Sequence, residues 1–167
     1  MLLRLAVCCG TLALFAAGCG GDDETTTAAT TSASPAGCEP AAVKQALDRF
    51  LAAITAGDRA RIARNLSDEP GFRLTIADPD GVFRTDSRAK ATAYLARRHR
   101  HGENQRLLQA VTRPGADAGH AAVQFTIVRT AADFPARDIH NRAAIGDATI
   151  NCLTHRFVRW RLATGRA

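Results

Sequence analysis

The chain has 167 residues, of which 22 are basic and 16 acidic, so its net charge is +6. This length suits one folded domain behind a leader segment, and no apolar run reaches the roughly 20 residues of a membrane-spanning helix. All basic residues except Lys44 and Lys90 are arginines, and alanine is abundant. We attribute this pairing to codon usage in a GC-rich genome, not to a phosphate-binding face, and we expect no nucleic-acid partner.

The chain begins with a short apolar segment, residues 5–17, behind the single basic residue Arg4. Apart from two cysteines, its only polar side chain is Thr11, which favours a cleaved signal over a buried helix. Small residues at 16–18 then precede Cys19. This arrangement resembles a bacterial lipoprotein signal, which implies removal of residues 1–18 and lipidation of Cys19 by acyl chains such as palmitate. Small residues before the cut also suit the peptidase of ordinary secretion, which stays the alternative.

Residues 19–39 are interpreted as the lipidated cysteine and a flexible tether. Positions 25–36 consist mainly of Thr, Ala and Ser, and no large apolar residue is present. Such a segment cannot offset its own ordering entropy by burial. We therefore expect the protein on the extracytoplasmic face of the cell membrane, held by its lipid anchor.

Two cysteines, Cys38 and Cys152, remain once the signal is removed and Cys19 is lipidated. An exported compartment permits a disulfide, and a bridge across so long a loop would contribute about 4 to 5 kcal/mol in the chain-entropy model. We favour a structural disulfide. Two free buried thiols or a metal pair are the alternatives, although no Cys or His neighbours them at zinc spacing.

The domain begins with two expected helices. Apolar residues in the segment 41–56 recur at intervals of three and four, which predicts an amphipathic helix on a core. Pro40 suits its first turn and Gly57 its end. Asp58 can cap a second, shorter helix.

A hairpin and a third helix follow. Residues 72–76 alternate as a strand, and the turn at 78–81 leads back into a short strand at 82–83. One of the residues 85–87 can cap a helix that runs to about position 101. Its last turn is the cationic run Arg97–His101, which we interpret as a solvated helix end that complements the helix dipole.

The remainder predicts an antiparallel sheet. Residues 105–113 fit a strand imperfectly, whereas 123–127 alternate cleanly. Residues 141–152 predict one long strand with a bulge or break at Gly146–Asp147, and 156–162 form the last strand.

This order of elements is typical of an α+β domain. Together with the first helix, the junction at residues 56–58 and the closing hairpin at 149–161, it resembles the NTF2-like superfamily, also called SnoaL-like or cystatin-like. The resemblance covers about residues 40–163 and implies that 40–167 form helices packed on a strongly curved antiparallel sheet, a cone with an apolar pocket. It implies no single function, because this fold hosts enzymes, ligand carriers and interaction domains.

Four aromatic residues are candidates for the pocket lining: Phe50, Tyr94, Phe125 and Trp160. No group of residues has a diagnostic catalytic spacing, so we name no catalytic residue, no metal site and no cofactor. We expect a non-catalytic module that binds a small apolar ligand or a protein partner, and a homodimer is a further expectation.

The alternative is an isomerase, dehydratase or hydrolase in which a buried Asp or His works with Tyr94 in the cone. The hydroxyl of Tyr94 would then donate to a developing oxyanion. Asp147 is the candidate base, and the candidate acids are His120, His140 and His155.

Overall fold

The computed structural model describes residues 37–78, 80–134 and 142–165. Residues 32–167 form a compact unit of their own. The predicted signal, Cys19 and His140 lie outside the described residues. Within the described ranges, no helix has the length and apolar character needed to cross a membrane.

Three helices form where the sequence predicts them: α1 (Pro40–Thr55), α2 (Arg59–Asn65) and α3 (Arg88–Arg100). The side chain of Asp58 caps α2 and that of Ser87 caps α3, each accepting a hydrogen bond from a backbone N–H three residues further on. These bonds satisfy donors that would otherwise lack partners in the first helical turn.

The sheet has six strands in the order β2-β1-β6-β5-β4-β3. Their bounds are β1 (Arg73–Asp78), β2 (Gly81–Thr85), β3 (Asn104–Pro114), β4 (His120–Thr130), β5 (Arg142–Asn151) and β6 (Phe157–Thr164). All neighbouring pairs are antiparallel except β1 and β6, which run parallel with Leu74 opposite Trp160. The prediction of a purely antiparallel sheet is therefore wrong at this pair. The chain leaving α2 already runs beside β6, since Leu66 bridges Phe157 in parallel, and alternation along a strand carries no information about its direction.

The predicted bulge or break at Gly146–Asp147 is absent, because β5 pairs continuously through Gly146 with both neighbouring strands. The glycine has another role. A Cβ atom at this position would lie 2.2 Å from Cζ of Phe125 on β4, so only glycine leaves room for that ring.

The sheet is irregular at two other places. The pairing of β3 with β4 shifts between Leu107 and Gln109, and the intervening Leu108 is exposed. The pairing of β5 with β6 shifts between Thr149 and Ile150. An extra residue in one strand breaks the inward–outward alternation, which explains why residues 105–113 fit a strand poorly.

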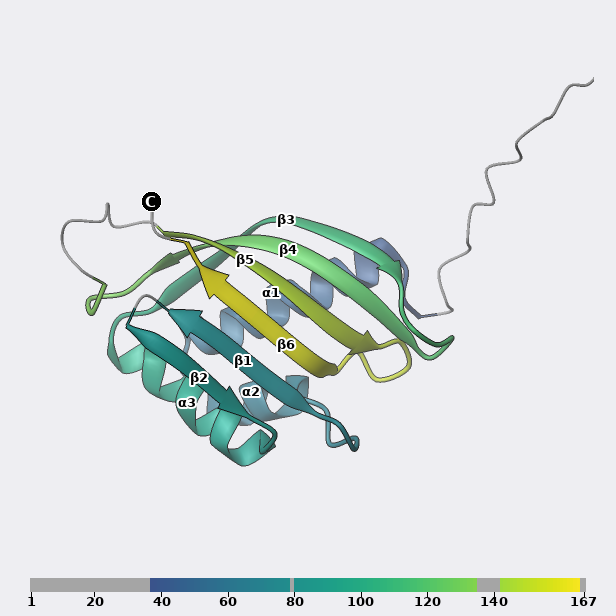
Figure 1. Ribbon diagram of the computed structural model, residues 1–167, viewed down its shortest axis with the longest axis horizontal. Coiled ribbons are helices and arrows are strands. Elements are labelled where there is room, and N and C mark those ends of the chain that lie inside the picture. The colour runs from purple at the N-terminus through teal and green to yellow at the C-terminus, as the bar shows by residue number, and fades with distance from the viewer. Residues whose placement is uncertain (1–36, 79, 135–141, 166–167) are drawn as a thin grey trace, which may run out of the picture. The chain divides into compact units, whose positions relative to one another are not determined.

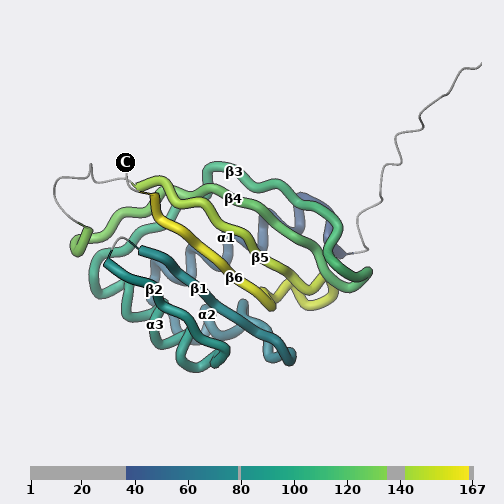
Figure 2. Tube along the Cα trace, viewed as in Figure 1, coloured from purple at the N-terminus to yellow at the C-terminus, as the bar shows by residue number. Residues whose placement is uncertain are grey.

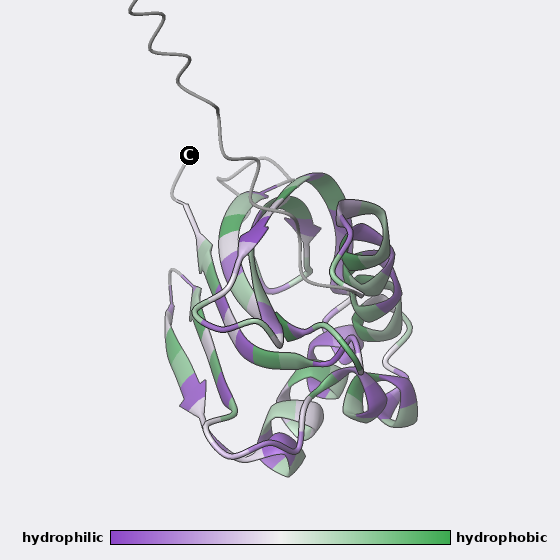
Figure 3. Ribbon diagram, turned by 90° about the vertical axis from the view of Figure 1, so that its right-hand side faces the viewer, coloured by the Kyte–Doolittle hydropathy of each residue, from purple (hydrophilic) through white to green (hydrophobic). Residues whose placement is uncertain are grey.

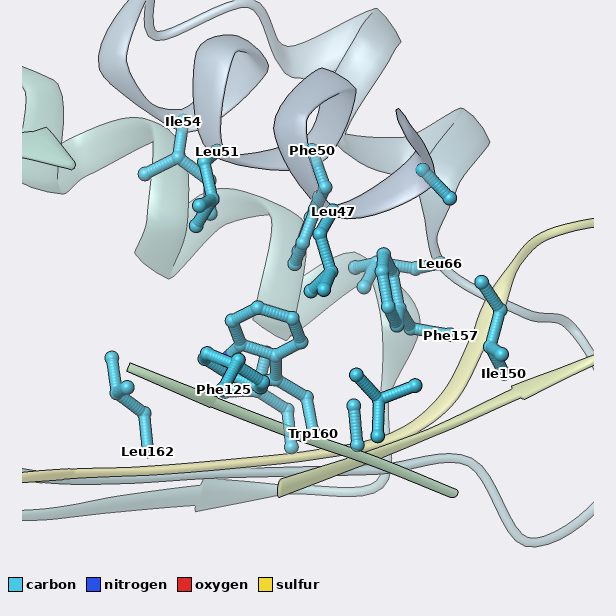
Figure 4. Close-up of a cluster of buried hydrophobic side chains, with 14 of the residues drawn as sticks. Leu47, Phe50, Leu51, Ile54, Leu66, Phe125, Ile150, Phe157, Trp160 and Leu162 are labelled. Atoms are coloured by element: carbon cyan, nitrogen blue, oxygen red, sulfur yellow. The ribbon is translucent and has the colours of Figure 1, made fainter. Parts of the chain in front are cut away.

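The helices pack on the concave face of the curved sheet, and no described element covers the opposite face (Figures 1 and 3). The path of the chain through this layer pair is seen in the Cα trace (Figure 2). Between the layers, side chains of α1 meet side chains of β4, β5 and β6 in one apolar core (Figure 4).

A disulfide joins Cys38, just before α1, to Cys152, just after β5, with Cα atoms 4.8 Å apart. This is the pairing that the cysteine count favours. The backbone at Gly37 also lies close to the backbone at Cys152. Gly37 has a φ of 84°, and a Cβ on it would lie 2.3 Å from the carbonyl oxygen of Cys152. The start of α1 is therefore held against the turn between β5 and β6.

Candidate interaction face

Three of the four predicted pocket residues are packed against one another. The side chains of Phe50, Phe125 and Trp160 are at most 2% exposed. Their ring centroids lie 4.9 Å apart for Phe50 and Trp160, and 4.5 Å apart for Phe125 and Trp160. Figure 4 shows these rings filling the space between α1 and the sheet. At such distances the rings are in direct contact, so they leave no cavity for a ligand between them.

Tyr94, the fourth, is half-buried at the side of the helical layer. Its ring stacks on Phe83 of β2 with a centroid distance of 3.9 Å, and the guanidinium of Arg97 lies 5.6 Å from its centroid. Burial, followed by the nearby carboxylate of Asp78, raises the pKa of Tyr94 above its ordinary value of 10.0. Among the described residues, no Asp or His is hydrogen-bonded to the Tyr94 hydroxyl.

His120 is the first residue of β4, directly after the turn from β3. Its Nδ1 is 2.7 Å from Oδ1 of Asp117 and its Nε2 is 3.1 Å from Oε2 of Glu69. The hydrogen bond to Asp117 is the main cause that raises the pKa of His120 above 6.5. Two carboxylates beside the imidazole favour its cation, which is the form that a general acid needs. The contacts of His120 go to Asp117 and Glu69, however, and not to Tyr94.

The remaining candidates of the enzyme hypothesis also lie apart from Tyr94. Nε2 of His155 is 2.6 Å from the carbonyl oxygen of Gly37, at the disulfide end. Asp147 is on the outer face of the sheet, 3.8 Å from Arg161, with half of its side chain exposed. His140 lies outside the described residues. The structure therefore brings none of the described candidates together with Tyr94.

The structure contains a buried ionic cluster that was not predicted from the sequence. The side chain of Arg129 is 1% exposed and that of Glu103 is fully buried, and Arg129 donates to Glu103, Asp78 and Thr164. Buried charges require such pairing, and this one ties β1, β4 and β6 to Glu103, the residue just before β3. The sequence does contain one sign of this cluster. Arg129 continues the series of inward-facing residues of β4, at a position where the alternation predicts an apolar residue.

The same cluster corrects the interpretation of the cationic run at the end of α3. Arg97, Arg100 and His101 are exposed, as a solvated helix end predicts. Arg98 is not: its side chain is 11% exposed, and it pairs with Glu103 and with Asp133. The prediction is wrong for this residue because the helix end faces the ionic cluster.

The outer face of the sheet is open in the described residues and carries apolar side chains that the core does not use. Ile145 is 68% exposed, Val82 55% and Val111 40%. A hollow of about 470 Å³ lies over β3, β4 and β5 and is lined by Val111, Ile145 and their polar neighbours Gln124 and Thr126. Large exposed apolar residues on one open face make it the candidate interaction surface.

Four arginines lie beside these apolar residues: Arg73 on β1, Arg84 on β2, and Arg159 and Arg161 on β6. With Thr75 they line a second hollow of about 300 Å³. The residues are far apart in the sequence, and only the register of the strands brings them together. Codon usage alone does not explain why these four arginines lie on one face.

No protein-family model matches the chain, and no curated protein matches it. Solved structures do. One is an uncharacterised protein with a cystatin-like fold from Caulobacter vibrioides, with a TM-score of 0.60 and 14% identity, covering 76% of this chain and 89% of that chain. Another is an NTF2-like protein of unknown function from Pseudomonas putida KT2440, with a TM-score of 0.57 and 11% identity, covering 76% and 87%.

A third is a protein of unknown function with a cystatin-like fold from Methylobium petroleophilum PM1, with a TM-score of 0.54 and 13% identity, covering 77% of this chain and 79% of that chain. Likeness at such identities concerns the fold alone. The predicted NTF2-like, α+β cone is confirmed.

Proposed function

We propose that the chain is an extracytoplasmic lipoprotein, anchored through Cys19, whose NTF2-like domain is a non-catalytic binding module that meets its partner with the outer face of the sheet. The observation that carries this proposal is a contrast between the two faces. The concave face is filled by its own aromatic core, whereas the outer face leaves large apolar side chains in solvent. A domain with a filled interior and an open apolar face is suited to docking, not to enclosing a ligand.

The enzyme alternative has little support in the described residues. A proton-transfer site needs an acid or base within hydrogen-bond reach of its partner. Asp78 is the carboxylate that most raises the pKa of Tyr94, but its oxygen is engaged by Arg129 and Thr164. The carboxylate is thus committed to a buried ion pair.

A second copy of the chain is a poor partner for the outer face. The strands of this face carry six exposed arginines against the single acidic residue Asp147. Those arginines are Arg73, Arg84, Arg106, Arg113, Arg159 and Arg161. Packing two such faces together would oppose like charges, so the partner we propose has a different chemistry. A monomer in solution, measured by light scattering, is the expected result.

The anchor is tested by replacing Cys19 with alanine in the full chain expressed in cells. We expect the variant to lose incorporation of labelled fatty acid and to leave the membrane fraction. The matched control is Cys9→Ala, because Cys9 lies inside the predicted signal peptide and would be removed with it. Unchanged incorporation of labelled fatty acid into the Cys19 variant would refute the anchor.

The face is tested by photo-crosslinking in cells. Gln124 is exposed on the outer face, and Gln45 is exposed on α1 behind the sheet, so the same photoreactive amino acid can replace either one. We expect an adduct from position 124, identified by mass spectrometry, and none from position 45. Adducts of equal yield from both positions would show that the outer face has no special role.

A further inference from the structure

We propose that Arg73, Arg84, Arg159 and Arg161, here called the arginine quartet, bind the phosphate groups of anionic phospholipids, so that the outer face of the sheet docks on the membrane surface. The inference deepens the proposed function and rests on it, because the anchor at Cys19 is what would bring the domain to a membrane.

The register of the sheet places the quartet in two neighbouring rows. Arg73 of β1 lies directly opposite Arg159 of β6, and Thr75 lies opposite Arg161 on one side and Arg84 on the other. Neighbouring strands are about 4.8 Å apart. The four guanidinium groups therefore surround one hollow, which they line together with Thr75.

This arrangement has a cost within the domain. Like charges directly opposite one another across two strands destabilise a sheet. Among the described residues, Arg73, Arg84 and Arg159 have no acidic partner, and Arg161 has only the exposed Asp147, at 3.8 Å. Exposed pairs of that kind contribute little. The quartet is thus a concentration of positive charge that the described part of the chain does not neutralise.

A phosphate group is the anion best suited to neutralise the positive charge of the quartet. A guanidinium is planar and donates two parallel hydrogen bonds to phosphate oxygens, which is why arginine, more than lysine, is used where such groups are recognised in pairs. Several guanidinium groups around one hollow can share the oxygens of adjacent phosphates. An anionic headgroup layer presents such phosphates in a plane.

The apolar neighbours of the quartet favour a lipid surface over a soluble phosphate. Val82 and Ile145 line the same small hollow as Arg84 and Arg161, and both are more than half exposed. A soluble anion would not bury these exposed apolar side chains. A membrane surface accommodates both, because basic residues meet headgroups while apolar residues reach the acyl boundary.

The predicted tether joins the domain at the end of the sheet where Arg73 and Arg159 lie. The disulfide joins Cys38 to Cys152 beside the turn that enters β6, and Arg159 is near the start of that strand, opposite Arg73 at the start of β1. In Figure 1 the described chain begins at this end of the sheet. Cys38 comes 19 positions after Cys19, a span of at most about 65 Å, so a lipidated Cys19 keeps the quartet near the bilayer.

The test uses residues 32–167, which form a compact unit of their own, and vesicles of phosphatidylcholine with or without phosphatidylglycerol. We expect co-sedimentation only with the anionic vesicles. The variant Arg73→Gln/Arg159→Gln should lower the partition coefficient about thirtyfold, since each basic residue near an anionic surface contributes about 1 kcal/mol and 1.4 kcal/mol is tenfold.

The matched control is Arg49→Gln/Arg64→Gln. These arginines are exposed on the helical side, where they line a separate hollow, and the variant loses the same net charge. We expect its partition coefficient to change less than about threefold. The midpoint of thermal unfolding of the Arg73/Arg159 variant should stay or rise, because a like-charge contact is removed, so that its loss of binding cannot be a loss of fold.

Three results would overturn the proposal: no binding to anionic vesicles, an equal loss in the control variant, or complete competition by millimolar inorganic phosphate. The last result would assign the quartet to a soluble phosphate. Because residues 32–167 lack Cys19, this assay fails or succeeds independently of the fatty-acid labelling experiment. Vesicle binding with unchanged fatty-acid incorporation into the Cys19 variant would refute the anchor alone.

Discussion

Replacing Phe50 with alanine tests whether the middle of the cone is a core or a cavity. Phe50 is fully buried on α1, with its ring centroid 5.0 Å from that of Phe157 and 4.9 Å from that of Trp160. Deleting a ring with contacts on several sides removes both its transfer free energy and its packing, at a typical cost of about 3–5 kcal/mol. Since a domain of this size has a free energy of unfolding of about 5–15 kcal/mol, the variant should still fold.

The assay is equilibrium unfolding in urea with the disulfide intact, followed by far-ultraviolet circular dichroism and by the fluorescence of Trp160, the only tryptophan. With a denaturant slope of about 1.5 kcal/mol per molar, a loss of 3 kcal/mol moves the midpoint by about 2 M. Phe83→Ala is the matched control, because Phe83 is only half-buried and should cost about 1.5 kcal/mol. A cost below about 1 kcal/mol for Phe50→Ala would refute the filled core, since a ring that lines an open cavity loses few contacts when removed.

Three further predictions follow from the same contacts. Gly146→Ala should lower the free energy of unfolding by about 1–3 kcal/mol through overpacking against Phe125, and Phe125→Leu should relieve part of this; strictly additive costs in a double-mutant cycle would contradict the clash. The raised pKa of His120 means that its cation stabilises the fold fully below pH 6.5 and that this contribution is lost as the pH rises through the raised pKa. The difference in unfolding free energy between wild type and His120→Asn should therefore shrink from mildly acidic to mildly alkaline buffer, and a constant or growing difference would count against the contacts of His120 with Asp117 and Glu69. Tyr94, the only tyrosine, should ionise above pH 10.0 in an absorbance titration at alkaline pH, and Asp78→Asn should move that titration downward; an ordinary titration in both proteins would mean that the ring is not buried near the carboxylate.

The sequence was sufficient for the helices and for most of the strands. Helix ends depend on residues within one turn of the boundary, and Asp58 and Ser87 act as caps in the structure. The alternation of β4 is a local pattern as well, and its odd positions are buried as predicted. Such features can be predicted because the physics involves neighbours in the chain.

The candidate pocket shows where local reasoning stops. An aromatic residue on a helix and two on strands can enclose a cavity or fill it, and both arrangements have the same pattern in the sequence. Whether Phe50, Phe125 and Trp160 leave a space depends on how closely α1 approaches the sheet. It also depends on residues far from α1 in the chain, such as Gly146, which leaves room for the ring of Phe125.

By itself, then, the sequence determined the order of elements, their caps and the pair of cysteines that forms the disulfide, all of which follow from neighbouring residues or from counting. The lipid anchor at Cys19 stays a prediction. Only the tertiary structure decided that β1 runs parallel to β6, that Arg129 is buried among carboxylates, and that four arginines surround one hollow on the open face. The physical reason is strand register. Which side chains share a face depends on the alignment of strands that are distant in the chain, and a shift of one residue would send every arginine of a strand to the opposite face.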